Sequence, residues 1–489
     1  MKDVVLLYIV MSTPCSIVYA ERTVWYVHPD SALNTIQAGL DSCANNDIVL
    51  VGPGTYYENI VWPNTQGINL ISELGSNLTV IDGDTTSRVI EISTGIDTSS
   101  LIRGFTIQNG RDTIGAGIYC GVASSPTITD NNINNNTAGN GIVSLMRWGI
   151  GGGIYCDSAS SPVIINNTIT DNVAGVLSGS VGGGIACFYA SPTISNNRIT
   201  YNAAGGFGGS GGGINCDHSS PIISGNTITN NSAMGLHGWG GGICCDSSSP
   251  LISSNTITQN SAGGSGSGGG GLCLQTASSL VTGNSISGNT ANFGGGIHCT
   301  VDDSSTITGN MITGNTANSF GGGLSCKLGA SPVIENCTVA DNYGDGIYCY
   351  EDANPFINYN NITDNVGYGI RNASSITVNA ENNWWGDVTG PYHPSLNPGG
   401  LGNAVSNYVD FDPWLNNPWG IEEEPIVKPI EACSDFAATI FHGPLRLPEG
   451  TKCKVFDITG RVVEPEKIAP GIYFVEIDNE VVEKVIKIK

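Results

Sequence analysis

Nine successive segments of this chain repeat a pair of asparagines at a fixed spacing, and this repeat limits the possible folds more than any other feature. The two asparagines follow a Pro or Ser by five and ten residues. The second asparagine stands at Asn136, Asn172, Asn202, Asn231, Asn260, Asn289, Asn315, Asn342 and Asn365. The first stands at Asn131, Asn167, Asn197, Asn226, Asn255, Asn284, Asn310 and Asn360, with Cys337 in its place once. Such a period indicates a stack of like units.

A second motif precedes each asparagine pair. It is Gly-Gly-Gly-Ile-x-Cys, as in Gly151 to Cys156. The second asparagine follows the Cys by 15 or 16 residues, whereas the next Cys follows that asparagine after 7 to 20. One Gly-rich loop, such as Ala203 to Ser210, therefore absorbs the length variation. The Ile-x-Cys segment and two apolar stretches near the asparagines predict three short strands per repeat.

Three strands in each of many repeats predict an all-β parallel solenoid of about 11–12 coils, a parallel β-helix. Equivalent residues of successive coils then lie ~4.8 Å apart. Asparagines stacked at this distance can pass a hydrogen bond from one side-chain amide to the next. The two asparagine columns are therefore explained by structure, and they need no catalytic role.

Eight cysteines form a column that we expect to point into the solenoid with the Ile of each motif. Leu274 replaces the Cys once, which indicates a need for a small apolar side chain rather than a metal ligand. The column is Cys120, Cys156, Cys187, Cys216, Cys245, Cys299, Cys326 and Cys349. Cys244 and Cys273 stand instead at the outward position x of adjacent repeats. Their Cα atoms would lie ~4.8 Å apart, so they are candidates for a disulfide.

The composition excludes several classes of protein. Charged residues are 12% of the chain, 18 basic against 42 acidic, and the formal net charge is −24. A nucleic-acid-binding protein would carry a basic surface, so nucleic acid is not expected as a partner. The 68 Gly and 49 Asn disfavour helices, and 40% hydrophobic residues exclude a disordered acidic tail. An acidic, turn-rich β protein remains.

The chain changes in character along its length. The predicted segments are a signal peptide (1–20), an N-terminal cap (21–60), a parallel β-helix (61–415), a linker (416–431) and a small C-terminal β-sandwich domain (432–489). A basic start, a short apolar run and small residues before a cleavage site near Ala20 are typical of export. The cap includes a short amphipathic helix between Ser31 and Ala44. No other apolar stretch is long enough for a transmembrane segment in the mature chain.

The repeats resemble right-handed parallel β-helix proteins of the pectin-lyase-like group over about residues 24–415, and the right hand is implied by this resemblance. The stretch Asn289 to Ile297 is also similar to repeats of bacterial polymorphic outer-membrane and adhesin-like proteins. The final domain resembles the C-terminal sorting domain of type IX secretion, through residues 455–462, 471–475 and 484–489. That resemblance implies the secretion machinery as a partner and a secreted or outer-surface location.

Two aspartates are candidates for catalysis. Asp217 and Asp246 follow the Cys position of adjacent repeats, at ~5 Å, a separation that suits the carboxylates of a retaining glycosidase. His298, at the outward position x, is a third candidate, with His218 and His237 as further histidines of this region. Two observations oppose catalysis: the β-helix has few permanent cations to hold an acidic sugar, and an Asp after a strand commonly forms a turn.

Aromatic residues recur just before the Gly triplet, at Trp239, Phe293 and Phe320. Together with Tyr119 and Tyr155 at position x, they are candidates for stacking on sugar rings. Aliphatic residues share the first of these columns, so packing of the loop is the alternative. No motif for a cofactor or metal site occurs, and calcium is the one ion that the scattered carboxylates would suit.

The sequence thus predicts a secreted or surface-displayed β-helix repeat protein for binding or adhesion, with polysaccharide or cell-surface glycans as partners. Two alternatives stay open: a polysaccharide-degrading hydrolase or lyase of the pectin-lyase-like fold, and a structural component of the cell envelope. A flat surface with stacked aromatic rings favours binding, whereas a loop-walled groove with converging Asp, His and Arg favours an enzyme. The fold alone does not decide between them.

Overall fold

The computed structural model describes most of the chain. The described residues are 22–93, 95–139, 148–175, 179–420, 439–441, 453–457, 461–464, 471–477 and 480–487. The predicted signal peptide and most of the predicted linker lie outside these residues. The chain divides into two units, Met1–Ile421 and Glu422–Lys489, and each is described by itself.

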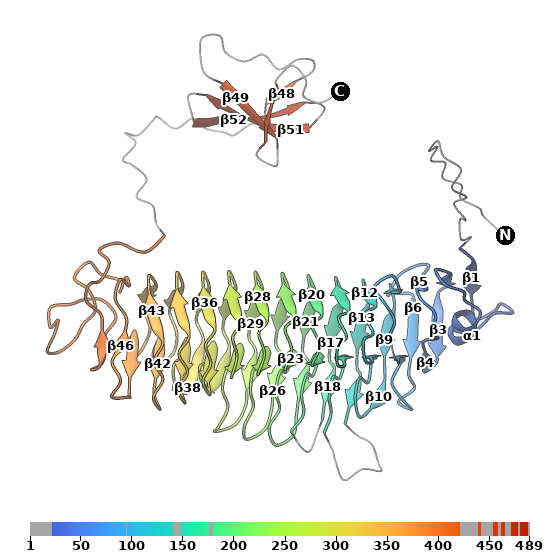
Figure 1. Ribbon diagram of the computed structural model, residues 1–489, viewed down its shortest axis with the longest axis horizontal. Coiled ribbons are helices and arrows are strands. Elements are labelled where there is room, and N and C mark those ends of the chain that lie inside the picture. Colours follow the sequence, from blue (N-terminus) through green and yellow to red (C-terminus); the bar gives the residue numbers. More distant parts are fainter. Residues whose placement is uncertain are drawn as a thin grey trace. The chain divides into compact units, whose positions relative to one another are not determined.

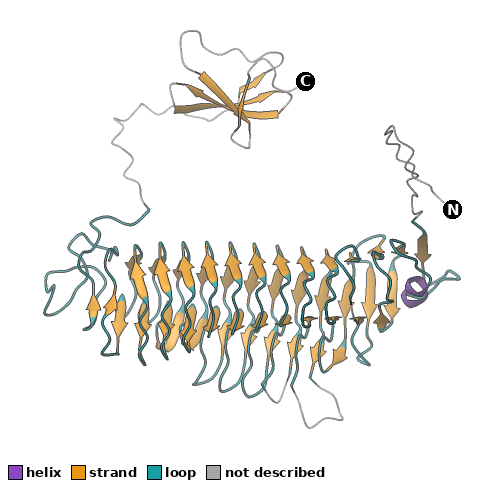
Figure 2. Ribbon diagram, in the orientation of Figure 1, coloured by secondary structure: helices purple, strands orange, loops and turns teal. Residues whose placement is uncertain are grey.

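The larger unit is a parallel β-solenoid, in which each strand pairs with its equivalents in the turns before and after it (Figure 1). Three long sheets run along it (Figure 2). Two of these sheets have twelve strands, which confirms the predicted number of about 11–12 coils. The predicted register is also confirmed, because Ile214 and Cys216 pair with Ile243 and Cys245 of the next turn.

Sheets A and B hold the strands on either side of the first asparagine column. Sheet A is β1 (Val24–Val27), β2 (Ile48–Val51), β5 (Asn69–Ser72), β8 (Leu101–Arg103), β12 (Thr127–Thr129), β16 (Val163–Ile165), β20 (Thr193–Ser195), β24 (Ile222–Ser224), β28 (Leu251–Ser253), β32 (Leu280–Thr282), β36 (Thr306–Thr308), β40 (Val333–Glu335), β43 (Phe356–Asn358), β46 (Val378–Asn379) and β47 (Val409–Asp410). Sheet B is β3 (Gly54–Tyr57), β6 (Thr79–Asp82), β9 (Thr106–Gln108), β13 (Asn132–Asn134), β17 (Thr168–Thr170), β21 (Arg198–Thr200), β25 (Thr227–Thr229), β29 (Thr256–Thr258), β33 (Ser285–Ser287), β37 (Met311–Thr313), β41 (Thr338–Ala340) and β44 (Asn361–Thr363).

Sheet C holds the Ile-x-Cys strands, and sheet D follows the second asparagine column. Sheet C is β4 (Ile60–Val61), β7 (Ile90–Ile92), β11 (Ile118–Cys120), β15 (Ile154–Cys156), β19 (Ile185–Phe188), β23 (Ile214–Asp217), β27 (Ile243–Asp246), β31 (Leu272–Gln275), β35 (Ile297–Thr300), β39 (Leu324–Cys326), β42 (Ile347–Cys349) and β45 (Ile370–Asn372). Sheet D is β10 (Arg111–Asp112), β14 (Thr137–Ala138), β18 (Val173–Ala174), β22 (Ala203–Ala204), β26 (Ser232–Ala233), β30 (Ser261–Ala262), β34 (Thr290–Phe293) and β38 (Thr316–Phe320).

Sheet D is a difference from the prediction of three strands per repeat. Its strands take up the first residues of the Gly-rich loops, where the sequence suggests only a loop of variable length. Ala174, Ala204 and Ala233 at the second strand position are buried. A small side chain here lets successive turns continue their backbone hydrogen bonds for two residues beyond the asparagine.

The lumen of the solenoid is apolar, as the motif predicts. All eight cysteines of the inward column are buried, and Leu274 takes the same position beside Cys245. The Ile residues of sheets A, B and C fill the remainder of the core. The column therefore serves as a stack of small apolar side chains, and its register along the axis is confirmed.

Two ladders of buried asparagine amides run along the solenoid. Asn202 donates from its backbone N–H and from Nδ2 to Asn231 Oδ1, at 3.0 Å in both cases. Its Nδ2 also donates to the carbonyl of Ile169, at 2.9 Å. The same pattern recurs on every turn of the second ladder, which confirms the predicted stacking. The structure adds Asn383 and Asn403 as final members of the first and second ladders.

One position interrupts the first ladder. Cys337 replaces an asparagine, and its Sγ accepts from the backbone N–H of Asn310 at 3.4 Å. Asn310 Nδ2 lies 3.8 Å from the same sulfur. Cys337 passes the ladder on through its backbone N–H, which donates to Asn360 Oδ1 at 2.9 Å. The ladder therefore tolerates a weaker acceptor at this turn.

The helix expected in the N-terminal segment is present but short. Among the described residues it is the single helix, α1 (Ile36–Asp41), and it lies at the β1 end of the solenoid (Figure 1). Ile36 and Leu40 are fully buried. At the other end, Trp385 is fully buried in the same core. No helix in the described part of the chain is long and apolar enough to cross a bilayer.

The described strands of the second unit form one five-stranded sheet. In sheet order they are β48 (Thr439–Phe441), β52 (Glu480–Lys487), β51 (Gly471–Ile477), β49 (Cys453–Asp457) and β50 (Val462–Val463). β51 pairs antiparallel with β49 and with β52. The alternating stretches therefore form strands, as predicted. The described strands include no second sheet, so the β-sandwich stays a prediction.

Candidate functional site

The residue at position x of each Ile-x-Cys strand points away from the lumen, because it alternates with the inward-facing Ile and Cys. Most side chains at this position are nevertheless buried. The buried residues at this position are Tyr155, Ala186, Asn215, Cys244, Cys273, His298, Ser325 and Tyr348. The chain before each Gly triplet runs beside them and forms its own line of bridges, from Ile150 to Trp239 and Phe293. Position x therefore points away from the lumen, as expected, but most of its side chains are covered by the chain before the Gly triplet.

A tight glycine turn produces this cover. Gly240 has a φ of +61°, and a Cβ there would lie 2.2 Å from the carbonyl oxygen of Ile243, so only glycine fits. The turn brings Trp239 back over the strands of sheet C. In the next turn Gly268 takes the position of Trp239. A Cβ on Gly268 would lie 2.5 Å from the ring of His298 and 2.9 Å from that of Trp239, so a side chain here would clash with both rings.

An aromatic platform lies over β35, β39 and β42. It consists of Trp239, Phe293, Phe320, Tyr348 and Tyr350. Phe320 stacks on Tyr348, with ring centroids 4.4 Å apart and planes 13° apart. Phe293 stacks on Phe320 and on Tyr350, at 6.0 Å in both cases. Every member except Tyr348 is partly exposed, so the platform offers ring faces to a ligand.

Two cations stand on this platform. Lys327 Nζ lies 5.7 Å from the ring centroid of Trp239, 5.5 Å from that of Phe293 and 6.0 Å from that of Tyr350. Arg371 lies over the Tyr348 ring at 5.8 Å. These distances suit cation–π interactions, which hold the two charged groups in place.

His298 lies beneath the platform, closed to solvent. It is fully buried and stacks on Trp239 at 5.6 Å. Its Nδ1 lies 2.6 Å from Ser325 Oγ. Burial, followed by the charge of Lys327, lowers the pKa of His298 to about 3, so the ring is neutral at physiological pH. The catalytic role suggested for His298 therefore does not fit its surroundings.

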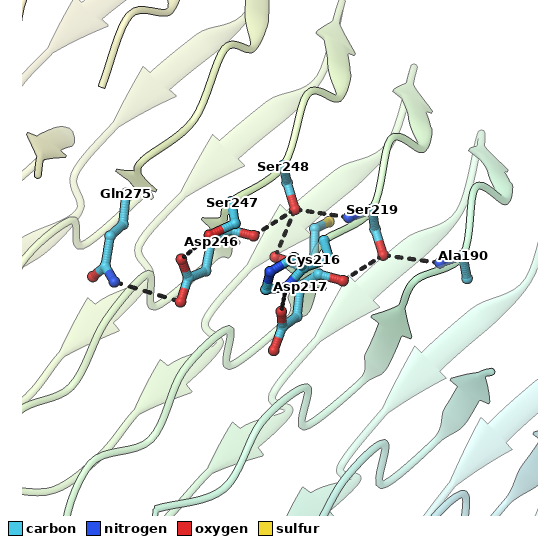
Figure 3. Close-up of polar contacts among 9 residues, drawn as sticks. Ala190, Cys216, Asp217, Ser219, Asp246, Ser247, Ser248 and Gln275 are labelled. Carbon is cyan, nitrogen blue, oxygen red and sulfur yellow. Dashed lines mark hydrogen bonds and ion pairs between the residues drawn. The ribbon is translucent and has the colours of Figure 1, made fainter. Parts of the chain in front are cut away.

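Asp217 and Asp246 lie side by side, as their spacing predicts. Their Cα atoms are partners at the ends of β23 and β27. Figure 3 shows that the two carboxylates have different partners. Asp217 contacts Nδ1 of His218, whereas Asp246 accepts from Ser247 Oγ at 3.0 Å and from Gln275 Nε2 at 3.4 Å. The pair is partly exposed, and His298 is two strands away on β35.

The other residues near this pair do not complete a catalytic group. His237 lies in the loop after β26, where its ring is 6.1 Å from that of Phe207. The hydroxyls of Ser219 and Ser248 donate to the backbone carbonyls of Asp217 and Asp246 (Figure 3). In the part of the chain that the structure describes, no three His, Cys, Asp or Glu side chains gather as around a metal ion.

Tyr119 and Tyr155 form a separate cluster over β11 and β15. Their rings stack at 5.5 Å, and both hydroxyls donate to Asp157, at 2.8 and 3.4 Å. Arg88 lies 4.4 Å above the Tyr119 ring and pairs with Asp112 at 3.1 Å. Burial and the hydrogen bond to Asp157 raise the pKa of Tyr119 to about 12. The cluster satisfies its own polar groups, so it offers less to a ligand than the platform does.

Cys244 and Cys273 are Cα partners on β27 and β31, which is the adjacency that a disulfide requires. In the structure both are buried free thiols that share a hydrogen bond. The thiol hydrogen bond and burial raise the pKa of Cys273 well above its usual range. The bond between them stays a prediction.

The sequence identified Trp239, Phe293 and Phe320 but missed the other two residues of the platform, Tyr348 and Tyr350, and the cation Lys327 that lies on it. Lys327 and Tyr350 come directly after the Cys of two successive turns, and Tyr348 stands at position x of the second turn. The sequence contains a signal for these residues, because a cation and two tyrosines occupy adjoining columns of neighbouring turns. Only the glycine turn, however, brings the residue before the triplet across to those columns.

Comparison with known proteins agrees with this architecture. The family described as "Right handed beta helix region" matches residues 29–242 and 212–384. A solved structure of the A-module of the mannuronan C-5 epimerase AlgE6 from Azotobacter vinelandii is similar, with a TM-score of 0.42 and 15% identity, over 77% of this chain and 94% of that chain. A search of curated protein sequences finds no match. The family match covers most of the solenoid and shows that the solenoid is right-handed. The chain belongs to the family of right-handed parallel β-helix proteins.

Proposed function

We propose that this protein binds glycans through the aromatic platform. The observation that carries the proposal is the group of mutually stacked rings over β35, β39 and β42, all of which except Tyr348 are partly exposed. Aromatic faces stack on the apolar C–H faces of sugar rings, and rigid side chains lose little conformational freedom on binding. The rings are fixed by one another and by Lys327, so the surface is preformed.

Replacing Phe293 and Phe320 together by alanine is expected to weaken glycan binding at least about tenfold. An aromatic contact contributes about 0.5–1.5 kcal/mol beyond its buried area, and 1.4 kcal/mol corresponds to a factor of ten. A glycan array followed by calorimetry on the best ligand measures the effect. Phe356→Ala is the matched control, because Phe356 is 47% exposed on β43 of sheet A. Unchanged affinity in a folded platform variant rules the platform out.

An enzyme acting on polysaccharides is the second candidate, and one observation favours it. Asp217 contacts His218 and stands next to Asp246, so a carboxylate pair and an imidazole occur together on the same edge of sheet C. The glycan panel separates the two functions. If the wild-type chain releases reducing ends or unsaturated products, and both Asp217→Ala and Asp246→Ala abolish this release, the protein is an enzyme rather than a binding protein. A structural envelope component would neither bind nor cleave the panel.

We also propose that the protein acts outside the cell or on its outer surface, and that residues 432–489 form a two-layered sorting domain for the secretion machinery. The support is the signal-like segment at 1–20, the antiparallel sheet of β49, β51 and β52, and the matching stretches of sequence. Removal of 432–489 is expected to leave the solenoid inside the envelope. Fractionation of cells that express the full and shortened chains measures this, and identical surface exposure of both contradicts it.

At the two ends of the solenoid, we propose that α1 and the segment around Trp385 act as caps. An open solenoid end exposes core residues and unpaired strand edges. Ile36 and Leu40 of α1 are fully buried, and so is Trp385, which supports this role.

A further inference from the structure

Among the described residues, no carboxylate lies within 4.0 Å of the ammonium group of Lys327. The ion pairs in the described part of the chain involve other cations, such as Arg88 and Arg371. The ammonium group of Lys327 instead faces the rings of Trp239, Phe293 and Tyr350. Rings hold a cation in place without neutralising it, so its charge remains available to an anion.

Three polar groups beside Lys327 also lack partners. Thr300, Lys327 and Tyr350 occupy one column on successive turns. Backbone hydrogen bonds of 3.0 Å link these turns: Lys327 N–H donates to the Cys299 carbonyl, and Tyr350 N–H donates to the Cys326 carbonyl. The hydroxyls of Thr300 and Tyr350 are buried without a hydrogen bond.

The third group is Nε2 of His298, two residues before Thr300 on β35. The ring of His298 stacks on Trp239 and lies 6.3 Å from Phe293, and both of these rings also face Lys327 Nζ. Buried polar groups in folded proteins almost always have a partner, so these three atoms leave hydrogen-bonding capacity unused around an unpaired cation.

We infer that the platform selects glycans that carry an anionic group, a carboxylate or a sulfate ester, and that this group binds against Lys327. The inference rests on the proposed glycan binding and adds its charge class. Hydrogen bonds between a cation and an anion are about twice as strong as neutral ones, and Lys327 is partly exposed, so an anionic group on a ligand can reach it. The net charge of −24 does not prevent this, because at physiological salt charges beyond about 8 Å are screened.

The test compares glycans that differ only in charge. Two pairs are suitable: dextran with dextran sulfate, and fully methyl-esterified with de-esterified homogalacturonan. The full chain is expected to bind the charged member of at least one pair more tightly, and to lose that preference as salt rises. Lys327→Gln is expected to weaken binding of the charged member at least about tenfold and to leave the neutral member within about twofold.

Arg198→Gln is the matched control, because it removes the same charge from an exposed position on β21 of sheet B. It is expected to change neither affinity. If the chain prefers the charged member in only one of the two pairs, that pair identifies the anionic group as a sulfate ester or a carboxylate. Equal binding of both members of both pairs, or a Lys327→Gln variant that keeps the preference, overturns the inference while glycan binding stands. If the wild-type chain binds none of the four polymers and nothing on the array, the proposed function fails with it.

Discussion

Replacing Asn231 with leucine is expected to lower the free energy of unfolding by at least about 3 kcal/mol. The side chain of Asn231 is fully buried. Its Oδ1 accepts two hydrogen bonds from Asn202, and its Nδ2 donates to the Ile199 carbonyl and to Asn260 Oδ1, all at 2.9–3.0 Å. Leucine has a similar volume but leaves these groups unpaired on both neighbouring turns, at about 1–3 kcal/mol for each buried group. Urea unfolding of the full chain measures the loss.

Two further variants separate the ladder from side-chain packing. Asn231→Cys is expected to lose less stability than the leucine variant, because the sulfur of Cys337 already accepts from Asn310 at the equivalent place in the other ladder. Cys337→Asn is expected to add about 1 kcal/mol, since Asn310 Nδ2 would gain an oxygen acceptor in place of sulfur at 3.8 Å. A leucine variant as stable as the wild type contradicts the ladder as a main source of stability.

The ladder also explains why much of the solenoid could be predicted from sequence. Each turn rests on the one before it, so equal spacing in the sequence becomes adjacency in space, as between Asn202 and Asn231. The prediction stopped one turn early, because Asn403 follows Asn365 after an insertion that changes the spacing. The strands of sheet D were missed for a different reason. Two residues with one small apolar side chain are too short a pattern to distinguish a strand from a loop.

The site was predicted less completely than the fold. Spacing along the chain gives neighbours along the axis, such as Asp217 and Asp246, but it does not give neighbours across a turn. The approach of Trp239 to Lys327 and His298 depends on the positive φ of Gly240, which reverses the chain before the strand. The sequence places position x on the outward face of the strand, but it does not show that the chain before the Gly triplet covers that face and buries His298.

Asp303 is a buried carboxyl group that the repeat does not explain, and it makes the stability depend on pH. It is fully buried between Ala277 and Ala330, which occupy the same place in the neighbouring turns. Its Oδ1 accepts from Ser305 Oγ at 2.7 Å, while its Oδ2 has no partner. Burial raises the pKa of Asp303 to about 7, in spite of the hydrogen bond from Ser305, which acts in the opposite direction.

The sign of the effect follows from proton linkage. Between pH 4 and pH 7 the folded chain keeps a proton on Asp303 that the unfolded chain has released, so the free energy of unfolding falls as the pH rises. The full loss, reached above about pH 7, is about 4 kcal/mol, since one pKa unit corresponds to about 1.4 kcal/mol. The stabilising contribution of the protonated group is complete below pH 4.

Asp303→Ala is expected to remove this decline and to be more stable than the wild type at pH 8, because alanine already fills the equivalent place in both neighbouring turns. Urea midpoints of the full chain from pH 4 to pH 8 measure the difference in stability between the variant and the wild type. The contributions of all other titrating groups cancel in this difference, because both chains contain them. Asp302→Asn is the control, since Asp302 is the same type of residue, stands next in the chain and is exposed. Parallel curves for Asp303→Ala and the wild type would mean that the carboxyl is ionised in the folded chain, with a partner that offsets its burial. A decline that disappears only in Asp303→Ala assigns the pH dependence to this one side chain, three residues after the end of β35, the strand that carries His298 and Thr300.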